Sequence, residues 1–329
     1  MISLPSVPRS PKGRMKPAST RARTRPKPAP PNPAGMVLRA PLLAQFPWLV
    51  HGFSTRLGGT SSFDPSRSAR AATDLNLGNV AWDSAGKVAE NRRRWMACLP
   101  ANGMDLVLQR QVHSDLIRTV DDAFAQASLP AGDALLTSRP GLLLGVLTAD
   151  CLPILLVDAK QRVVAALHCG WRGTARRLAQ KAVGRMRLLY GSHPDDLWAA
   201  IGPGIRSCCY AVGPEVLEAF SCQFPYAESL FVTRARPMTP METKRSIMVI
   251  AFRSNFGPRT RQETHLDLPL ANLRQLRDAG IPENQIASEA PCTSCRPELF
   301  FSHRRDAGFA GRMMAVVGIR KKPRRGGKF

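Results

Sequence analysis

The sequence predicts an α+β fold, a single domain in which mixed β-sheets are flanked by helices and a functional site lies at strand ends. Apolar runs of strand length occur in the middle of the chain and near its C-terminus, with amphipathic helical segments among them. The elements do not follow the strict strand–helix–strand alternation of a doubly wound sheet, and no internal repeat is present. We therefore expect one catalytic domain over residues 37–319.

The N-terminal part of this domain is expected to combine short strands with one long helix. HGFSTRLGG (His51–Gly59) predicts a strand followed by a Gly-Gly turn. Ser84 is expected to cap the helix that follows. Val107–Val112 predicts a strand that carries His113 at its end, and Ile117–Val120 is expected to pair with that strand.

The apolar centre of the domain, Leu142–Gly173, contains three runs of strand length, and the last two predict a hairpin. The runs are Leu142–Thr148, Ile154–Val157 and Arg162–His168, with Asp158–Gln161 as the polar turn. If the hairpin loop has two residues, Cys151 lies directly opposite His168, with the Cβ atoms about 4.5–5.5 Å apart. A bulge near Pro153 would shift this register.

The C-terminal half predicts alternating helices and strands with one irregular insertion. Thr174 is expected to cap a helix that ends near Tyr190. Residues 233–263 are polar, rich in Arg and weakly patterned, which indicates an insertion loop. The remaining elements are expected to be a strand at Leu197–Gly202, a helix with Pro214 in its first turn, a helix at Leu270–Asp278 and a last strand at Arg312–Ile319.

The net charge of +23 is concentrated at the two ends of the chain. Residues 1–35 contain 8 Lys and Arg and no acidic residue, and residues 320–329 contain 6 and none. The chain between them carries 33 basic against 24 acidic residues, a net charge of +9. Segments so rich in Pro, Ser, Arg and Lys cannot bury a core, so residues 1–36 and 320–329 are expected to be disordered basic tails. Contact with nucleic acid is expected to be non-specific and through these tails only.

The sequence favours a cytoplasmic protein without membrane association. The N-terminus lacks the apolar segment of a secretory signal. No apolar run reaches the roughly 18 residues that a transmembrane helix needs. The 8 cysteines have no framework spacing, which is typical of reduced thiols.

Three residues of types that commonly bind zinc are expected at strand ends, namely His113, Cys151 and His168. Two imidazoles and one thiolate suit Zn²⁺, and three protein ligands leave a fourth position for water or substrate. Each of these residues alone is more typical of a packed side chain, so the metal hypothesis depends on the three lying together. Asp150 is the adjacent acid, but on an extended strand it points away from Cys151.

Cys151 and His168 also fit a chemistry that needs no metal. An imidazole beside a thiol lowers the pKa of the thiol, as in cysteine nucleophiles. The protein would then be a metal-free Cys–His hydrolase, and His113 would have no direct role. The two hypotheses therefore differ in the function of His113.

The other cysteines are weaker candidates for metal binding. Cys292 and Cys295 have the spacing of a zinc knuckle, but the sequence offers no second pair of this kind. Cys208 and Cys209 are adjacent and are not expected to bind one ion together. Cys169 is expected to point to the opposite face of the sheet from His168.

Ten motifs resemble those of the bacterial family known as laccase-domain or polyphenol oxidase proteins, which includes purine nucleoside phosphorylases and peptidoglycan editing factors. In chain order they read HGFSTRLGG, LNLG, QVH, GDALLT, TADCLP, HCGWRG, IGPGIRSCCYAVG, LDLP, CTSC and FFSHRRD. They extend from about His51 to Ile319, and the set is specific although no single motif is. Cys169, where the family usually has Ala, and His303, where an aromatic residue is common, depart from the pattern.

The resemblance implies a zinc enzyme whose ligands are the His of QVH, the Cys of ADCLP and the first His of HCGWRG, here His113, Cys151 and His168. Copper is the alternative metal. It further implies purine nucleoside phosphorylase activity on adenosine, inosine and guanosine, with adenosine deaminase and S-methyl-5'-thioadenosine phosphorylase activities, so purine nucleosides and phosphate are the expected partners. Such an enzyme is both a transferase and a hydrolase. A four-copper laccase is excluded, because its sites need on the order of ten histidines and the chain has 6.

Three residues are candidates for substrate binding. Arg172 and Arg305 are expected to hold phosphate or ribose, although surface or capping arginines look the same in sequence. Asn76 of the LNLG motif is a candidate contact to ribose or base, and an Asx-turn is the alternative.

Two further functions are alternatives to the phosphorylase. The first, from the same family, is a peptidoglycan-editing hydrolase that acts on a muramyl-linked amino acid. The second is a non-enzymatic protein that binds RNA or anionic surfaces through its basic tails. Metal content, and the effect of deleting the tails, distinguish these classes.

Overall fold

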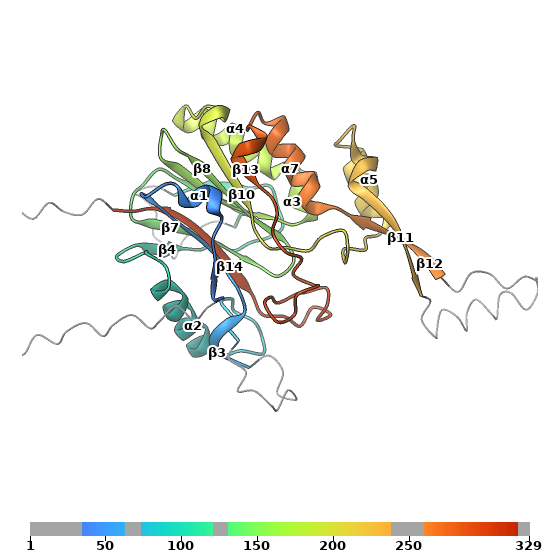
Figure 1. Ribbon diagram of the computed structural model, residues 1–329, viewed down its shortest axis with the longest axis horizontal. Coiled ribbons are helices and arrows are strands. Elements are labelled where there is room, and N and C mark those ends of the chain that lie inside the picture. Colours follow the sequence, from blue (N-terminus) through green and yellow to red (C-terminus); the bar gives the residue numbers. More distant parts are fainter. Residues whose placement is uncertain (1–34, 63–73, 121–130, 238–259, 322–329) are drawn as a thin grey trace, which may run out of the picture.

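Two β-sheets form the centre of the computed structural model, which describes residues 35–62, 74–120, 131–237 and 260–321 (Figure 1). The five-stranded sheet has the order β1 (Val37–Leu38), β2 (Leu49–Ser54), β14 (Met313–Ile319), β7 (Leu142–Thr148) and β4 (Asp105–Val107). The six-stranded sheet has the order β13 (Ile286–Ala287), β10 (Leu197–Ile201), β8 (Leu152–Asp158), β9 (Val163–Cys169), β6 (Ala134–Thr137) and β5 (Ile117–Thr119). Each sheet contains parallel and antiparallel neighbours, which confirms the predicted mixed α+β fold.

Both sheets are buried on both faces, and this explains why their central strands are nearly continuous apolar runs. In β8, Leu155 packs between the two sheets, whereas Leu156 packs on the opposite face among residues of the helices. The helices on that face are α3 (Trp171–Ala175), α4 (Leu178–Tyr190) and α7 (Leu268–Asp278). Trp95 of α2 (Ala85–Ala97) packs with side chains of the five-stranded sheet. The chain therefore forms four layers, with helices outside two stacked sheets.

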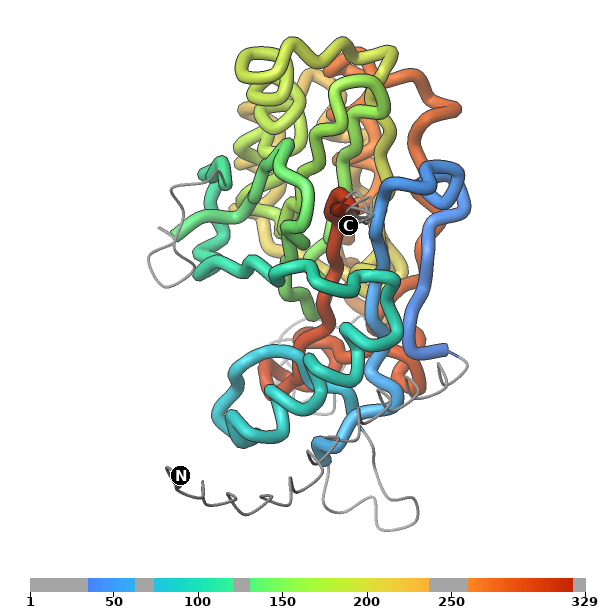
Figure 2. The backbone as a smooth tube through the Cα atoms, turned by 90° about the vertical axis from the view of Figure 1, so that its left-hand side faces the viewer, coloured from blue at the N-terminus to red at the C-terminus, as the bar shows by residue number. Residues whose placement is uncertain are grey.

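The two ends of the described chain meet in the five-stranded sheet. Figure 2 shows the red trace of β14 running beside the blue trace of β2, and the two strands pair antiparallel. Ser84 caps α2 as predicted, because its hydroxyl accepts a hydrogen bond from the N–H of Lys87 at 3.3 Å. A short helix, α1 (Pro41–Ala44), connects β1 to β2. No helix in the described part of the chain is long and apolar enough to cross a membrane.

The predicted strand Val107–Val112 and its predicted partner Ile117–Val120 are corrected by the structure. Strand β4 ends at Val107, and β5 pairs parallel with β6 instead of β4. The reason is that the side-chain amide of Gln111 takes the place of a backbone neighbour. The Gln111 amide donates a hydrogen bond to the carbonyl of Leu147 and accepts one from the N–H of Leu147, each at 2.8 Å. The backbone of Leu147 therefore keeps its hydrogen bonds although the chain leaves the sheet after β4.

The hairpin of β8 and β9 forms as predicted, but its register is shifted. His168 pairs with Pro153, so Cys151 lies just beyond the ladder and not directly opposite His168. The turn has four residues instead of two, because one carboxylate oxygen of Asp158 accepts two backbone N–H groups of the turn, each at 2.8 Å. A shift of two residues keeps the faces of the strands unchanged, which leaves Cys151 and His168 diagonal neighbours.

The helix predicted from Thr174 to Tyr190 is interrupted. Arg177, with φ of 63°, separates α3 from α4. Thr174 lies inside α3 and does not cap it, because its hydroxyl accepts a hydrogen bond from Asn272 of α7 at 3.0 Å. Thr174 therefore joins α3 to α7 instead of capping a helix.

The predicted insertion at residues 233–263 begins and ends as a strand. β11 (Phe231–Pro237) and β12 (Thr260–Leu266) pair antiparallel as a two-stranded ribbon, and residues 238–259 between them lie outside the described residues. Helix α5 (Pro214–Ser221) begins at Pro214 as predicted. Most residues of the predicted tails, 1–36 and 320–329, are likewise outside the described part. The predicted boundary at residue 36 is wrong, because Met36 is buried and packs in the same cluster as Val50 and Trp95.

Candidate functional site

His113, Cys151 and His168 come together beside one end of the β8–β9 hairpin. Their ligating atoms all lie within 4.8 Å of one another. The two imidazole centroids are 5.0 Å apart, and the ring planes meet at 71°. His168 is buried, Cys151 is half-buried and His113 is exposed, so the group opens to solvent on the side of His113. This arrangement suits three protein ligands around an ion with one open position.

Asp133, which directly precedes β6, orients two of these three residues. One carboxylate oxygen accepts hydrogen bonds from Nδ1 of His168 at 2.8 Å and from the N–H of His113 at 3.0 Å. The other accepts from the N–H and the hydroxyl of Ser114 at 2.6 and 2.7 Å. Because an ionised carboxylate only accepts, Nδ1 of His168 carries the proton and Nε2 is left to bind a metal. The same contacts hold His113 in its left-handed conformation, with φ of 56°.

The charges of the site favour a thiolate at Cys151. Burial raises the pKa of this thiol, but the charge of His168 and hydrogen bonds from both histidines outweigh burial and lower the pKa to about 6. Burial lowers the pKa of His168, while the Cys151 thiolate and Asp133 raise it to about 9. Burial also opposes ionisation of Asp133, yet hydrogen bonds from His168 and Ser114 bring its pKa well below its usual value. A thiolate is the form of cysteine that either binds a metal or attacks a substrate.

Gly170 provides the close packing that this group requires. It follows β9 and precedes the first turn of α3. A Cβ atom at this position would lie 2.9 Å from Sγ of Cys151 and 3.3 Å from Cδ2 of His113. Any larger residue would therefore displace a candidate ligand.

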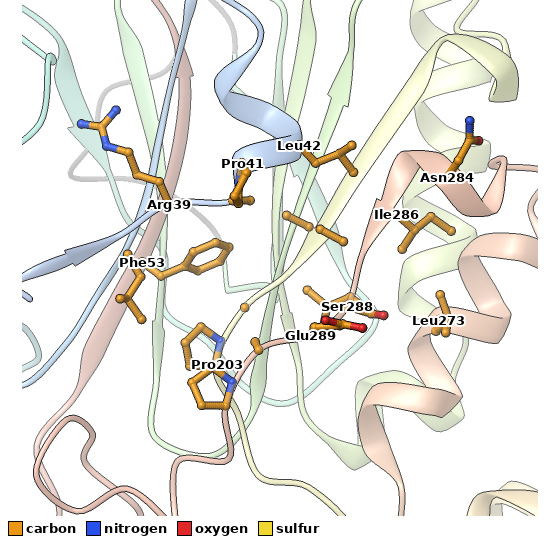
Figure 3. Close-up of a pocket in the computed structure, with 18 of the residues that line it drawn as sticks. Arg39, Pro41, Leu42, Phe53, Pro203, Leu273, Asn284, Ile286, Ser288 and Glu289 are labelled. Atoms are coloured by element: carbon orange, nitrogen blue, oxygen red, sulfur yellow. The ribbon is translucent and has the colours of Figure 1, made fainter.

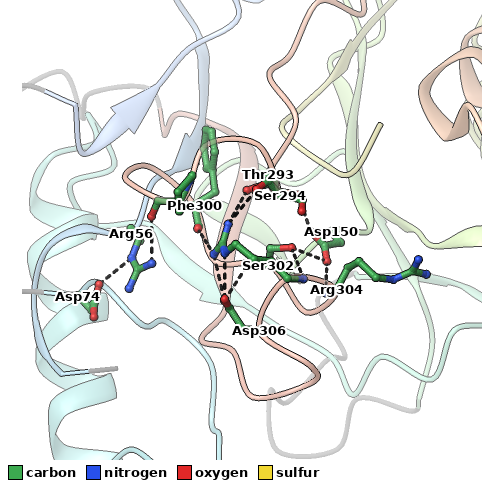
Figure 4. Close-up of polar contacts among 11 residues, drawn as sticks. Arg56, Asp74, Asp150, Thr293, Ser294, Phe300, Ser302, Arg304 and Asp306 are labelled. Atoms are coloured by element: carbon green, nitrogen blue, oxygen red, sulfur yellow. Dashed lines mark hydrogen bonds and ion pairs between the residues drawn. The ribbon is translucent and has the colours of Figure 1, made fainter. Parts of the chain in front are cut away.

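Asp150 fixes the backbone that carries Cys151 (Figure 4). Its carboxylate is buried and accepts hydrogen bonds from the hydroxyls of Thr293 and Ser302, at 2.5 and 3.0 Å, and from the N–H of Arg304 at 2.7 Å. The φ of Asp150 is 85°, a left-handed conformation that these bonds maintain. Asp150 is thus a positioning residue.

The structure favours the Asx-turn alternative for Asn76. Its side chain is fully buried and exchanges hydrogen bonds with the backbone of Gly78 at 3.0 and 3.2 Å. It also donates to Asp83 at 2.8 Å and accepts from the N–H of Arg312 at 2.9 Å. With its polar atoms used inside the protein, Asn76 is not available to a ribose or base.

The two candidate arginines differ in what they contact. Arg305 pairs with Asp306 through Nε at 2.9 Å and also donates to the carbonyls of Thr293 and Phe300, each at 3.0 Å, which ties two loops together (Figure 4). This is a structural role. Arg172 is exposed, and its guanidinium lies 4.4 Å from the ring centroid of Trp171. It makes no side-chain hydrogen bond or ion pair with any residue that the structure describes, so it is the better candidate for an anionic substrate.

A cavity of about 730 Å³ lies elsewhere in the molecule (Figure 3). Phe53, Pro203, Leu273 and Ile286 line it, together with the acidic side chain of Glu289. None of the three candidate ligands borders this cavity. We place the chemistry at His113, Cys151 and His168, where the nucleophilic and metal-binding groups converge.

Sequence reasoning assigned no role to Asp133. Its partner His168 is distant in the chain, and the pairing of β6 with β9 brings His168 to it. The available signal was a carboxylate between Gly132 and the buried strand that begins at Ala134, because a charge at such a position needs partners.

Known proteins are similar to this chain over most of its length. The model of the family described as multi-copper polyphenol oxidoreductase laccase matches residues 50–320. A purine nucleoside phosphorylase from Deinococcus radiodurans is 37% identical over 294 residues, which cover 89% of this chain and 95% of that protein. Adenosine deaminase RL5, from an unknown prokaryotic organism, is 33% identical over 82% of this chain and 97% of its own length. The crystal structure of the hypothetical protein YfiH from Bacillus licheniformis, 32% identical, matches with a TM-score of 0.70 over 87% of this chain and 97% of that chain. The chain therefore belongs to the multi-copper polyphenol oxidoreductase laccase family, whose members named above include a purine nucleoside phosphorylase and an adenosine deaminase.

Proposed function

We propose that the protein is a zinc-dependent purine nucleoside phosphorylase with adenosine deaminase and S-methyl-5'-thioadenosine phosphorylase activities. The observation that carries this proposal is the convergence of His113, Cys151 and an Asp133-oriented His168 on a point that is open to solvent. The names of two relatives, a purine nucleoside phosphorylase and an adenosine deaminase, support the choice of substrate.

The donor set of one thiolate and two imidazole nitrogens fits zinc, and a thiolate also suits copper as the alternative metal. Zinc held by these residues would supply Lewis-acid activation. Asp133 accepts a hydrogen bond from Nδ1 of His168 and so directs Nε2 toward the metal, which would displace any proton there, and Gly170 leaves room for the sulfur of Cys151. Exposure of His113 gives the substrate its entry side.

The two proposed reactions use different nucleophiles at the same site. In phosphorolysis, phosphate oxygen bonds to C1' of the ribose as the N-glycosidic bond breaks, which releases the free base and ribose 1-phosphate. In deamination, oxygen from water replaces the amino group at C6 of adenosine, which leaves as ammonia. Only phosphorolysis needs a phosphate anion in the site, and the free guanidinium of Arg172 is suited to hold it.

The function is tested on protein purified without chelator, with zinc content and turnover measured on the same sample. Inosine should yield hypoxanthine only when phosphate is present, whereas adenosine should yield ammonia without phosphate. Both activities should disappear on chelation and return with zinc. Absence of turnover of adenosine, inosine and S-methyl-5'-thioadenosine by zinc-loaded protein would overturn the proposal.

Arg172→Ala should lower phosphorolysis of inosine by about 10-fold or more while deamination of adenosine changes little. One charge-assisted hydrogen bond to an anion contributes about 1.5–3 kcal/mol, and deamination does not use phosphate. The measurement is kcat/KM for each reaction, and the control is Arg185→Ala, an exposed arginine on α4. An equal loss of both activities in Arg172→Ala would mean that the arginine supports the nucleoside or the fold.

Removal of residues 1–34 and 322–329 should leave nucleoside turnover unchanged. Their composition, rich in Pro, Ser, Arg and Lys, cannot contribute to a packed active site. Any weak RNA binding should vanish with them and should fall steeply with salt in the intact protein. Loss of catalysis on truncation would place the tails in the site and contradict the predicted domain boundaries.

A further inference from the structure

Four cysteines outside the site described above lie together at the surface. Cys208 and Cys209 belong to one turn, and Cys292 and Cys295 to another. Their sulfur atoms all lie within 4.8 Å of one another. The Sγ of Cys295 is 3.4 Å from that of Cys208 and 3.3 Å from that of Cys209. The sequence offers no second pair with the spacing of Cys292 and Cys295, but the fold brings the adjacent Cys208 and Cys209 beside them.

The turn conformation explains how adjacent cysteines reach the same point. Residues 206–209 form a tight turn, in which the N–H groups of Cys209 and Tyr210 both bond to the carbonyl of Arg206, at 2.9 and 3.0 Å. On a strand, neighbouring side chains point to opposite faces, but in a helical turn they diverge by only about 100°. Cys208 and Cys209 can thus face one partner, contrary to the sequence-based expectation.

The two turns are held together by bonds that do not involve the sulfur atoms. The N–H of Thr293 donates to the carbonyl of Gly204 at 3.0 Å. The guanidinium of Arg206 donates to the carbonyl of Ala290 at 2.7 Å. The four thiols therefore converge on a scaffold that is already built, as a preorganised metal site requires.

The spacing separates a metal site from a disulfide. Four sulfur ligands at about 2.3 Å from a tetrahedral zinc ion are about 3.8 Å apart from each other, whereas a disulfide needs about 2.05 Å. The observed separations of 3.3 and 3.4 Å, within a group that spans no more than 4.8 Å, fit the first arrangement. All four cysteines are free.

We propose that Cys208, Cys209, Cys292 and Cys295 form a second metal site, a structural one that binds zinc through four thiolates. Four protein ligands leave no open position, so this site holds a fold together and does not act on substrate.

This second site is connected to the first through Asp150, whose carbonyl also accepts a hydrogen bond from the N–H of Ile205, just before the turn of Cys208 and Cys209, at 2.8 Å. Thr293, between the ligands Cys292 and Cys295, donates its hydroxyl to Asp150 at 2.5 Å, and Asp150 directly precedes Cys151 (Figure 4). Zinc in the four-cysteine site would therefore hold the loop that positions Cys151. The inference does not depend on the proposed catalytic function, because it rests on other residues and other contacts.

The experiment is metal counting on the full chain, purified without chelator under reducing conditions. Native mass spectrometry and elemental analysis should find about two zinc ions per wild-type chain. Cys295→Ser and Cys208→Ser, which replace exposed thiols, should each lose one ion, and His113→Ala should lose the other. Cys222→Ser, an exposed cysteine at the end of α5, is the matched control and should retain both ions.

Cobalt distinguishes the two sites spectroscopically. In Co²⁺-loaded His113→Ala protein, the intense visible and near-ultraviolet bands of tetrahedral thiolate coordination should remain, and adding Cys295→Ser to His113→Ala should abolish them. Wild-type zinc content in Cys295→Ser, iron in place of zinc, or an intact mass that shows a disulfide among these cysteines would overturn the proposal. If a variant fails to fold, the number of zinc ions bound per wild-type chain still tests the proposal.

Discussion

Cys151→Ser should lower both the affinity for the catalytic metal and kcat/KM by more than about 100-fold. Loss of a hydrogen-bond partner behind a metal ligand already lowers affinity or activity by about 10–100-fold, and loss of the ligand itself should have a larger effect. A serine hydroxyl stays protonated near neutral pH and binds zinc far more weakly than the thiolate that His113 and His168 maintain at Cys151. The measurements are the zinc dissociation constant by chelator competition and kcat/KM for inosine phosphorolysis. Cys222→Ser should behave as wild type.

His113→Ala decides between the metal site and a cysteine nucleophile. Under the metal hypothesis it should be as damaging as Cys151→Ser, because two ligands do not replace three. The charge pattern of Cys151 and His168 also suits a Cys–His hydrolase, for which His113 would matter little and chelators not at all. A chelator-insensitive wild type with a largely active His113→Ala variant would therefore reject the zinc enzyme and establish the nucleophile.

Asp133→Asn should weaken zinc binding and kcat/KM by about 10–100-fold, the usual effect of losing the carboxylate behind a metal-binding histidine. It should also lower the free energy of unfolding by about 1–3 kcal/mol, because a side-chain amide presents only one acceptor oxygen to a buried group of N–H and hydroxyl donors. Zinc affinity, steady-state kinetics and thermal unfolding measure these effects separately.

Asp158→Asn is the matched control for this prediction. Asp158 is equally buried, and it accepts two backbone N–H groups in the β8–β9 turn. Its substitution should lower stability without changing the affinity for zinc. If Asp133→Asn behaved in the same way, the carboxylate would serve the fold only, and His168 would be oriented by other groups.

The sequence by itself determined the elements whose apolar runs are long and buried on both faces. Strands β7, β9 and β14 agree with their predicted ranges to within one residue at each end, since burial on two sides leaves few polar positions, whereas β8 is longer than the predicted Ile154–Val157. Ser84 was identifiable because a side-chain cap is a local interaction. The three candidate ligands could be chosen because they combine residue types that bind zinc with expected positions at strand ends.

Only the tertiary structure decided the features that depend on distant partners. Gln111 ended a predicted strand by bonding to Leu147, and the Asp158 turn moved the hairpin register by two residues. Asp133 gained its role when β6 paired with β9 and brought His168 to it. The four cysteines joined because two turns, more than 80 residues apart in the chain, are clamped by backbone hydrogen bonds. A carboxylate or thiol has many potential partners in sequence, and the packing of the sheets and loops selects among them.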